Sequence, residues 1–292
     1  MPKRASLDEI RAFFAKMMAA ASGTGDPRYE RAFELVRRDA FLGPGPWHAL
    51  GFTPVAGIRP NYVETPSADP AYLYQNLLFA LDVGKHINNG EPFLHAGWIG
   101  SVAPMPGEAV CHIGAGTGYY SAILAVLTLP GGTVQAFEID ENLARKARRN
   151  LEPFDNVSVT TGDATKLQLP RSDLIYVNAG VVAPPPSWLQ ALRPGGRMIF
   201  PWRPSEAVGL TLLLTRAGAG FRVKPLGPSF FIPCVGASNT HECSKIPDSG
   251  AAWSARSAWL RADREPDWTA VAVYRQMWFS AAAIPAEQQP PA

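Results

Sequence analysis

The chain has 292 residues, of which 47% are hydrophobic and 18% are charged, the balance of an ordinary globular protein with ample material for a core. A formal net charge of +2 is too small to indicate a nucleic-acid or membrane-surface partner. The three cysteines form no metal-ligand or disulfide pattern, which favours a reducing, cytoplasmic compartment, and no apolar run approaches the roughly 18 residues of a membrane span.

The first 105 residues predict a mostly helical extension. The N-terminus begins basic and ends in small residues like a secretory signal, but charged residues interrupt its apolar part. Ser6 and Glu9 instead have the spacing of a capping box, so we expect an amphipathic helix. Further helices are expected at residues 29–41, 69–83 and 93–102, the second with Asp69 as its N-cap.

From residue 108 the pattern changes to an alternation of strands and helices, which is typical of βαβ units. We therefore expect an α/β fold, with a doubly wound and mostly parallel sheet over residues 106–240. The helical extension over 1–105 precedes it, and an extension over 241–292 with no clear pattern follows. The expected strands include DLIYVNAG, GGRMIFP and residues 208–215 and 230–235, and the expected helices are 119–129, 142–151 and 186–192.

The segment CHIGAGTGYY carries the strongest signal in the chain. Gly114 and Gly116 would let the backbone pass close to a ligand, and the helix that starts near Gly118 offers unsatisfied N–H groups. The dinucleotide fingerprint is G-x-G-x-x-G, whereas here the third glycine comes one position early and Tyr119 takes its place. This spacing favours a ligand without a pyrophosphate, although a tight turn that binds nothing is the plainer alternative.

Two acidic residues follow the next two expected strands. Glu138 ends TVQAFEID, where a carboxylate can accept both hydroxyls of a ribose. Asp163 follows the third strand in TTGDAT and can accept a hydrogen bond from an adenine amine. Each alone could be a surface carboxylate or a helix cap, but together with the glycines they indicate a nucleoside pocket.

Residues 108 to about 235 resemble a class I S-adenosylmethionine-dependent methyltransferase, and most of all the protein-L-isoaspartate O-methyltransferase family. The resemblance rests on four segments in order, VCHIGAGTGYYSAILA, VQAFEID, VTTGDATK and DLIYVNAGVVAPPPSWLQALRPGGRMIFP. It implies a Rossmann-like fold and S-adenosyl-L-methionine as cofactor. It also implies that Gly114, Ala115, Gly116 and Thr117 lie along the methionine part of the cofactor and that Glu138 holds the ribose hydroxyls. Ile139 would lie against the adenine face, Asp163 and Ala164 at the adenine edge, and Asn178 near the reactive end.

The chain departs from the family at two places. His112 stands where the family has an acidic residue, and it is either a satisfied strand histidine or a cofactor contact. The family's serine-containing acceptor segment corresponds to GKHINNGEP, where Asn88 replaces the serine. Either Asn88 and Asn89 line the acceptor site or the NNG sequence is only a turn. His86 could be a base toward a hydroxyl acceptor or a plain loop histidine.

A carboxylate acceptor needs no general base, because it is already ionised at neutral pH. We therefore predict an O-methyltransferase of the isoaspartyl type acting on a protein, peptide or small-molecule carboxylate, with no metal, nucleic-acid or membrane partner. The alternatives are a methyltransferase for a different acceptor and a non-catalytic protein that binds the cofactor. An NAD-linked oxidoreductase is disfavoured by the glycine spacing. The sequence leaves the oligomeric state open.

Overall fold

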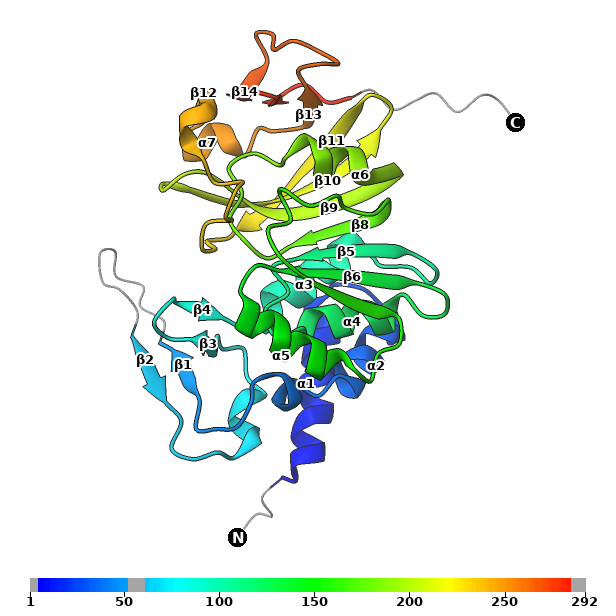
Figure 1. Ribbon diagram of the computed structural model, residues 1–292, viewed down its shortest axis with the longest axis vertical. Coiled ribbons are helices and arrows are strands. Elements are labelled where there is room, and N and C mark those ends of the chain that lie inside the picture. Colours follow the sequence, from blue (N-terminus) through cyan, green and yellow to red (C-terminus); the bar gives the residue numbers. More distant parts are fainter. Residues whose placement is uncertain (1–4, 52–60, 285–292) are drawn as a thin grey trace. The chain divides into compact units, whose positions relative to one another are not determined.

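The computed structural model describes residues 5–51 and 61–284, and the chain divides into two compact units, Met1–Gly162 and Asp163–Ala292 (Figure 1). The first unit begins with helices that pack on one another, since α1 contacts both α2 and α3. Their bounds are α1 (Leu7–Ala21), α2 (Pro27–Leu35), the 3₁₀ helix η1 (Arg38–Phe41) and α3 (Pro92–Val102).

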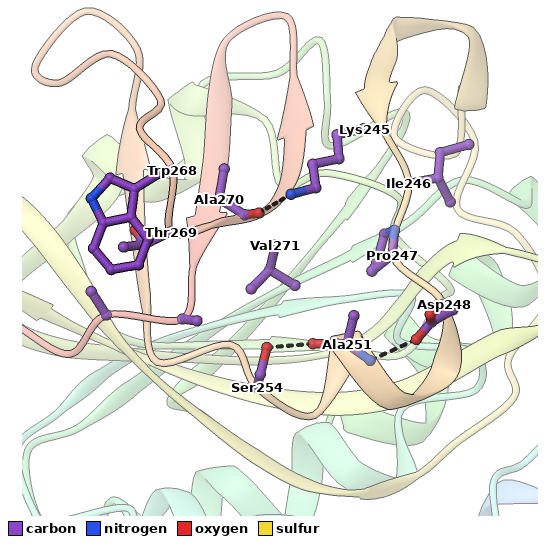
Figure 2. Close-up of a pocket in the computed structure, with 12 residues that line it drawn as sticks. Lys245, Ile246, Pro247, Asp248, Ala251, Ser254, Trp268, Thr269, Ala270 and Val271 are labelled. Carbon is purple, nitrogen blue, oxygen red and sulfur yellow. Dashed lines mark hydrogen bonds between the residues drawn. The ribbon is translucent and has the colours of Figure 1, made fainter.

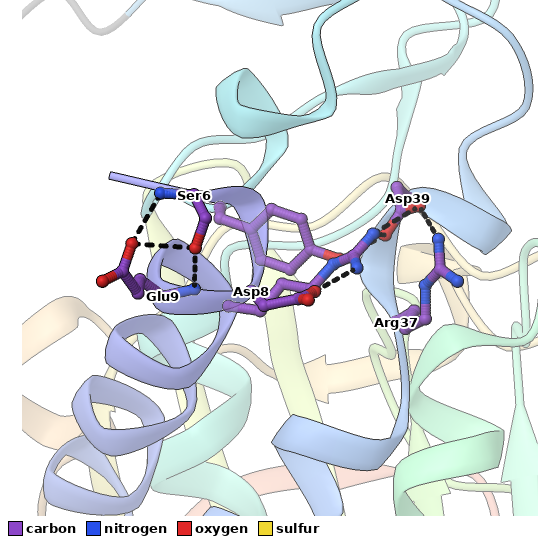
Figure 3. Close-up of polar contacts among 7 residues, drawn as sticks. Ser6, Asp8, Glu9, Arg37 and Asp39 are labelled. Carbon is purple, nitrogen blue, oxygen red and sulfur yellow. Dashed lines mark hydrogen bonds and ion pairs between the residues drawn. The ribbon is translucent and has the colours of Figure 1, made fainter. Parts of the chain in front are cut away.

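The first helix starts as its sequence predicts. The Ser6 N–H donates to Glu9 Oε2 at 2.7 Å, and the Glu9 N–H donates to Ser6 Oγ at 3.3 Å, which completes the capping box (Figure 3). One turn later, Arg11 Nη2 lies 3.1 Å from Asp39 Oδ1, and Arg37 Nη2 lies 2.9 Å from Asp39 Oδ2. The Arg11–Asp39 pair ties α1 to η1, and the Arg37–Asp39 pair is local to the start of η1.

Short antiparallel hairpins separate η1 from α3, and here one sequence expectation is wrong. Residues 69–83 do not form a helix, although Asp69 does cap the start by accepting from the Ala71 N–H at 3.0 Å. The buried guanidinium of Arg38 binds three carbonyls of this segment, which a continued helix would have used for its own hydrogen bonds. The elements are β1 (His48–Leu50) with β2 (Tyr62–Glu64), the 3₁₀ helix η2 (Pro70–Leu73), and β3 (Ala80–Asp82) with β4 (Ile87–Asn88).

The rest of the first unit is the alternating pattern that the sequence predicts. Its strands pair in parallel in the order β5-β6-β7, and α4 and α5 pack against β6 and β7. Asp140 caps α5 by accepting from the Asn142 and Leu143 N–H groups. The bounds are β5 (Ala109–Ile113), α4 (Tyr119–Leu127), β6 (Thr133–Glu138), α5 (Glu141–Leu151) and β7 (Val157–Thr161).

The second unit begins with a parallel pair and continues antiparallel. Strands β8 and β9 pair in parallel, and the order within this unit is β12-β14-β15-β13-β11-β10-β9-β8. The elements are β8 (Ser172–Val177), α6 (Pro186–Ala191), β9 (Leu192–Ser205), β10 (Val208–Ala217), β11 (Gly220–Pro228), the 3₁₀ helix η3 (Thr240–Glu242), β12 (Cys243–Lys245), α7 (Ser249–Ala252), β13 (Ser257–Leu260), β14 (Ala270–Tyr274) and β15 (Met277–Ser280).

Three findings about this unit go beyond the sequence prediction. Residues 230–235 are not a strand, because only an isolated bridge joins Pro233 to Gly180. The C-terminal extension, for which the sequence pattern predicts no definite elements, adds the four strands β12 to β15. The core of the second unit contains large aromatic side chains, and Trp188 of α6, Trp202 of β9 and Trp278 of β15 are fully buried. The Trp202 indole N–H donates to both Val182 O and Tyr274 Oη at 3.0 Å, which joins β9 to β14.

Candidate functional site

The turn after β5 depends on its glycines. Gly114, Gly116 and Gly118 all have left-handed backbone angles, with φ of 76°, 59° and 95°. A Cβ at Gly118 would stand 2.7 Å from Leu151 Cδ1, so a side chain there would also collide with α5. The N–H groups of Gly114 and Ala115 donate to Phe137 O at 2.9 and 3.0 Å, which fixes the turn to the end of β6.

The carboxylate of Glu138, the last residue of β6, binds the backbone of this turn. Its Oε2 accepts from the Gly116 N–H at 2.7 Å, and its Oε1 accepts from the Asp140 N–H at 3.0 Å. Burial raises the pKa of the Glu138 carboxyl, and the backbone N–H bonds offset part of that increase. Each oxygen keeps a second lone pair, so the carboxylate can still accept two hydroxyl donors. The neighbouring Ile139 is 46% exposed, an apolar surface beside the carboxylate.

The other side chains predicted near the turn point into the protein. His112 is fully buried with Nδ1 2.7 Å from Ser121 Oγ, and burial lowers its pKa to about 3, so the ring is neutral. Tyr119 packs against Phe41 with ring centroids 5.6 Å apart. Thr117 is buried, and its carbonyl accepts from Asn150 Nδ2 at 3.0 Å. These residues therefore present their backbone, not their side chains, along the turn.

The acceptor candidates lie on the β3–β4 hairpin. His86 has a left-handed φ of 53°, which is uncommon for a residue with a side chain. Asn88 Oδ1 accepts from Tyr62 Oη at 2.8 Å, and Asn88 Nδ2 donates to His86 O at 3.2 Å. The His86 ring stacks on Tyr62 with centroids 6.0 Å apart. Asn89 is 6% exposed, and its Nδ2 has no hydrogen-bond partner within residues 5–51 and 61–284.

Tyr62 was missed by the sequence reasoning. It joins His86 to Asn88, yet it lies 26 residues before Asn88, and nothing in the local pattern NYVE connects the two. The hairpin also reaches the glycine turn, since Leu81 Cδ1 lies 3.2 Å from where a Cβ on Gly116 would stand.

The remaining predicted residues belong to the second unit. Burial raises the pKa of the Asp163 carboxyl, but hydrogen bonds from Thr165 and the charge of Lys166 more than offset this, so the pKa is lowered overall. Ala164 is buried, and its carbonyl accepts from Trp188 Nε1 at 3.0 Å. Asn178 follows β8 and is half-buried. In the described part of the chain no group of histidine, cysteine and acidic side chains could hold a metal ion.

The second unit also has an open cavity of about 510 Å³ in its C-terminal extension (Figure 2). Trp268, 94% exposed, stands at its edge. Three polar side chains that line the cavity form hydrogen bonds to the backbone of the extension. Lys245 donates to Ala270 O, Ser254 Oγ donates to Ala251 O at 2.7 Å, and Asp248 accepts from the Ala251 N–H at 2.7 Å. None of the described helices is both long and apolar enough to cross a membrane.

The comparisons with known proteins agree on one family. Residues 58–239 match the model of protein-L-isoaspartate(D-aspartate) O-methyltransferase. The chain is 32% identical over 187 residues to a protein-L-isoaspartate O-methyltransferase of Pelotomaculum thermopropionicum, which covers 63% of this chain and 80% of the relative. It is 34% identical over 217 residues to a protein of the same name from a Bradyrhizobium strain, which covers 73% and 88%.

Solved structures give the same fold. A protein-L-isoaspartate O-methyltransferase superposes with a TM-score of 0.65 at 21% identity, covering 94% of this chain and 88% of the other. A Plasmodium falciparum protein described as a protein-L-isoaspartate O-methyltransferase, in complex with S-adenosyl-L-homocysteine, superposes with a TM-score of 0.59 at 15% identity, covering 77% and 97%. At these identities the likeness shows the class I methyltransferase fold.

Proposed function

The chain belongs to the protein-L-isoaspartate(D-aspartate) O-methyltransferase family, and on that premise we propose that it transfers a methyl group from S-adenosyl-L-methionine to an isoaspartyl carboxylate of a protein or peptide. The observation that carries the proposal is the left-handed glycine turn with the Glu138 carboxylate bound to the Gly116 N–H. This arrangement fits the cofactor because the turn allows close approach and the carboxylate retains lone pairs for the two ribose hydroxyls.

The chain's own residues then have simple tasks. When bound, S-adenosyl-L-methionine would supply a methyl group whose bond to the sulfonium sulfur breaks as the bond to a carboxylate oxygen forms, leaving S-adenosyl-L-homocysteine and a methyl ester. The backbone from Gly114 to Thr117 would follow the methionine part, Glu138 would hold the ribose, and Ile139 would cover the adenine. The assignments of Asp163 and Ala164 to the adenine edge and of Asn178 to the reactive end stay predictions from the sequence. Alignment of the two reactants and exclusion of water supply the acceleration.

The acceptor segment would act through its amides and Tyr62. Asn88 already uses its amide oxygen toward Tyr62 of β2 and its amide nitrogen toward His86 of the hairpin, but each has capacity for a second hydrogen bond. An isoaspartyl carboxylate is ionised at neutral pH, so amide and hydroxyl donors suffice to orient it and no base is required. His86, which stacks on Tyr62, would form a wall of this site.

Two measurements separate binding from chemistry. Titration calorimetry with S-adenosyl-L-methionine should show tight binding that Glu138→Ala weakens severely without unfolding the protein, whereas NADH should give no heat. Labelled S-adenosyl-L-methionine should then transfer its methyl group to an isoaspartyl peptide as a base-labile ester. Binding without transfer to any peptide would favour the non-catalytic alternative, and binding of NADH alone would refute the proposal.

We also propose a cytoplasmic location. The cysteines Cys111, Cys234 and Cys243 are all free thiols, and burial raises the pKa of each. Cysteines that form no disulfide suit a reducing compartment. Cell fractionation of the tagged protein tests this, and recovery outside the cytoplasm would refute it.

A further inference from the structure

We propose that Lys85 is a positioning residue, whose ion pair with Asp140 fixes the β3–β4 hairpin and its acceptor-site side chains against the glycine turn. The inference rests on the proposed function, because it assumes that His86 and Asn88 face the methyl acceptor. It concerns a pair of residues that are 55 positions apart and that the sequence analysis did not single out.

The ion pair meets a fixed carboxylate. Lys85 Nζ lies 2.5 Å from Asp140 Oδ2, while the other carboxylate oxygen, Oδ1, accepts from the N–H groups of Asn142 and Leu143 at 2.9 and 3.1 Å. The Asp140 side chain is 16% exposed. Because the helix cap already holds this carboxylate, forming the ion pair costs only the conformational entropy of the lysine side chain.

A continuous set of contacts leads from the hairpin to the turn. Asp140 donates its N–H to Glu138 Oε1 at 3.0 Å, and Glu138 Oε2 accepts from the Gly116 N–H at 2.7 Å. Leu81, at the base of the same hairpin, approaches Gly116 directly. Backbone hydrogen bonds thus fix Asp140 to the glycine turn, and its carboxylate gives Lys85 of the hairpin a rigid anchor.

The hairpin needs such a fixed point. Its strands have only three and two residues, and the tip from Val83 to His86 is exposed. His86 holds a left-handed conformation, which persists only when its surroundings impose it. At its base the hairpin is fixed by the bond from the Asn89 N–H to Phe79 O at 2.9 Å and by Tyr62 on Asn88. Lys85 supplies the contact at the tip.

The test measures acceptor affinity and hairpin mobility separately. Lys85→Met should raise the KM for an isoaspartyl peptide about two- to fivefold, the range of a partly exposed ion pair, and leave kcat and the cofactor Kd unchanged. Lys85→Arg should restore the wild-type KM. Asp140→Asn keeps the helix cap and loses the charge, so it should raise the KM by the same factor as Lys85→Met, and the KM of the double variant should be no higher than that of either single variant. Lys146→Met, an exposed lysine on α5, is the control.

Hydrogen exchange provides a readout without turnover. Amides of residues 80–90 should exchange faster in Lys85→Met than in Lys146→Met, with the rest of the first unit unchanged. Equal exchange in the two variants would overturn the proposal, and so would faster exchange with an unaltered KM. If wild-type protein modifies no peptide, the proposed function fails, and the exchange result still decides whether Lys85 fixes the hairpin.

Discussion

The buried arginine of η1 allows the sharpest prediction about stability. Arg38 is fully buried, and its guanidinium donates to Leu73 O at 2.6 Å, to Gln75 O at 2.9 Å and to Leu77 O at 2.8 Å. Its Nη2 also lies 3.5 Å from Gly90 O, two residues after the end of β4. Burial lowers its pKa, yet an arginine stays charged at neutral pH.

Replacing Arg38 by lysine keeps the charge and loses the geometry. A single ammonium has three donors on one atom, so it cannot span carbonyls that two separate nitrogens reach now. It also loses the stacking of the guanidinium over Phe79, whose centroid lies 5.3 Å away. A buried hydrogen bond to a charged group contributes about 1.5–3 kcal/mol, so the loss of two should lower the free energy of unfolding by about 3–6 kcal/mol.

The neighbouring arginine is a matched control. The side chain of Arg37 is 57% exposed and forms an ion pair with Asp39, so Arg37→Lys should cost less than about 1 kcal/mol. Urea unfolding followed by tryptophan fluorescence and circular dichroism measures both variants. If Arg38→Lys costs no more than Arg37→Lys, the carbonyl contacts do not organise the 73–77 segment as we argue.

Three further predictions concern the glycine turn and the strand beneath it. Glu138→Gln places an amide opposite a backbone N–H and should weaken cofactor binding about 10- to 100-fold by calorimetry. The cofactor affinity of the wild-type protein should fall as pH drops through the raised pKa of this carboxyl, and an affinity that is the same at all pH values would contradict this. Because the pKa of buried His112 is about 3, its ring stays neutral in the folded state, while in the unfolded chain it gains a proton below about pH 6.5. The free energy of unfolding should therefore fall by up to about 1.4 kcal/mol per pH unit on acidification, and it should depend less steeply on pH in His112→Gln than in His241→Gln, a variant of an exposed histidine. Gly118→Ala should lower the unfolding midpoint and abolish cofactor binding, because of its φ of 95° and the clash with Leu151, and a normal midpoint would show that the turn tolerates a side chain.

The α/β core could be predicted because its signals are local. The hydrophobic periodicity, the helix caps and the turn glycines all lie within the segment whose structure they determine. Asp140 at the start of α5 and the glycines after β5 are examples. The expected helix over 69–83 failed because Arg38, at least 31 positions away, takes its carbonyls. A single-sequence pattern cannot show which distant side chain will bind a backbone.

In the candidate site, too, local features could be predicted from the sequence and long-range contacts could not. Glu138 and the glycines follow from strand ends, which the sequence marks. Tyr62 on Asn88 and Lys85 on Asp140 are contacts between segments far apart, and only the fold brings them together. The strands of the C-terminal extension were missed because their buried aromatic residues do not alternate regularly with polar ones. MWFS of β15 is buried at every position.

The most direct test of the account is a comparison of two peptides that differ only in one linkage. Wild-type protein is incubated with labelled S-adenosyl-L-methionine and either an isoaspartyl peptide or its normal aspartyl twin, and base-labile label is counted over time. We predict label on the isoaspartyl peptide alone, and its loss when Glu138→Ala is used. Equal label on both peptides, or none on either while the cofactor binds, would contradict the proposal that this chain methylates isoaspartyl carboxylates.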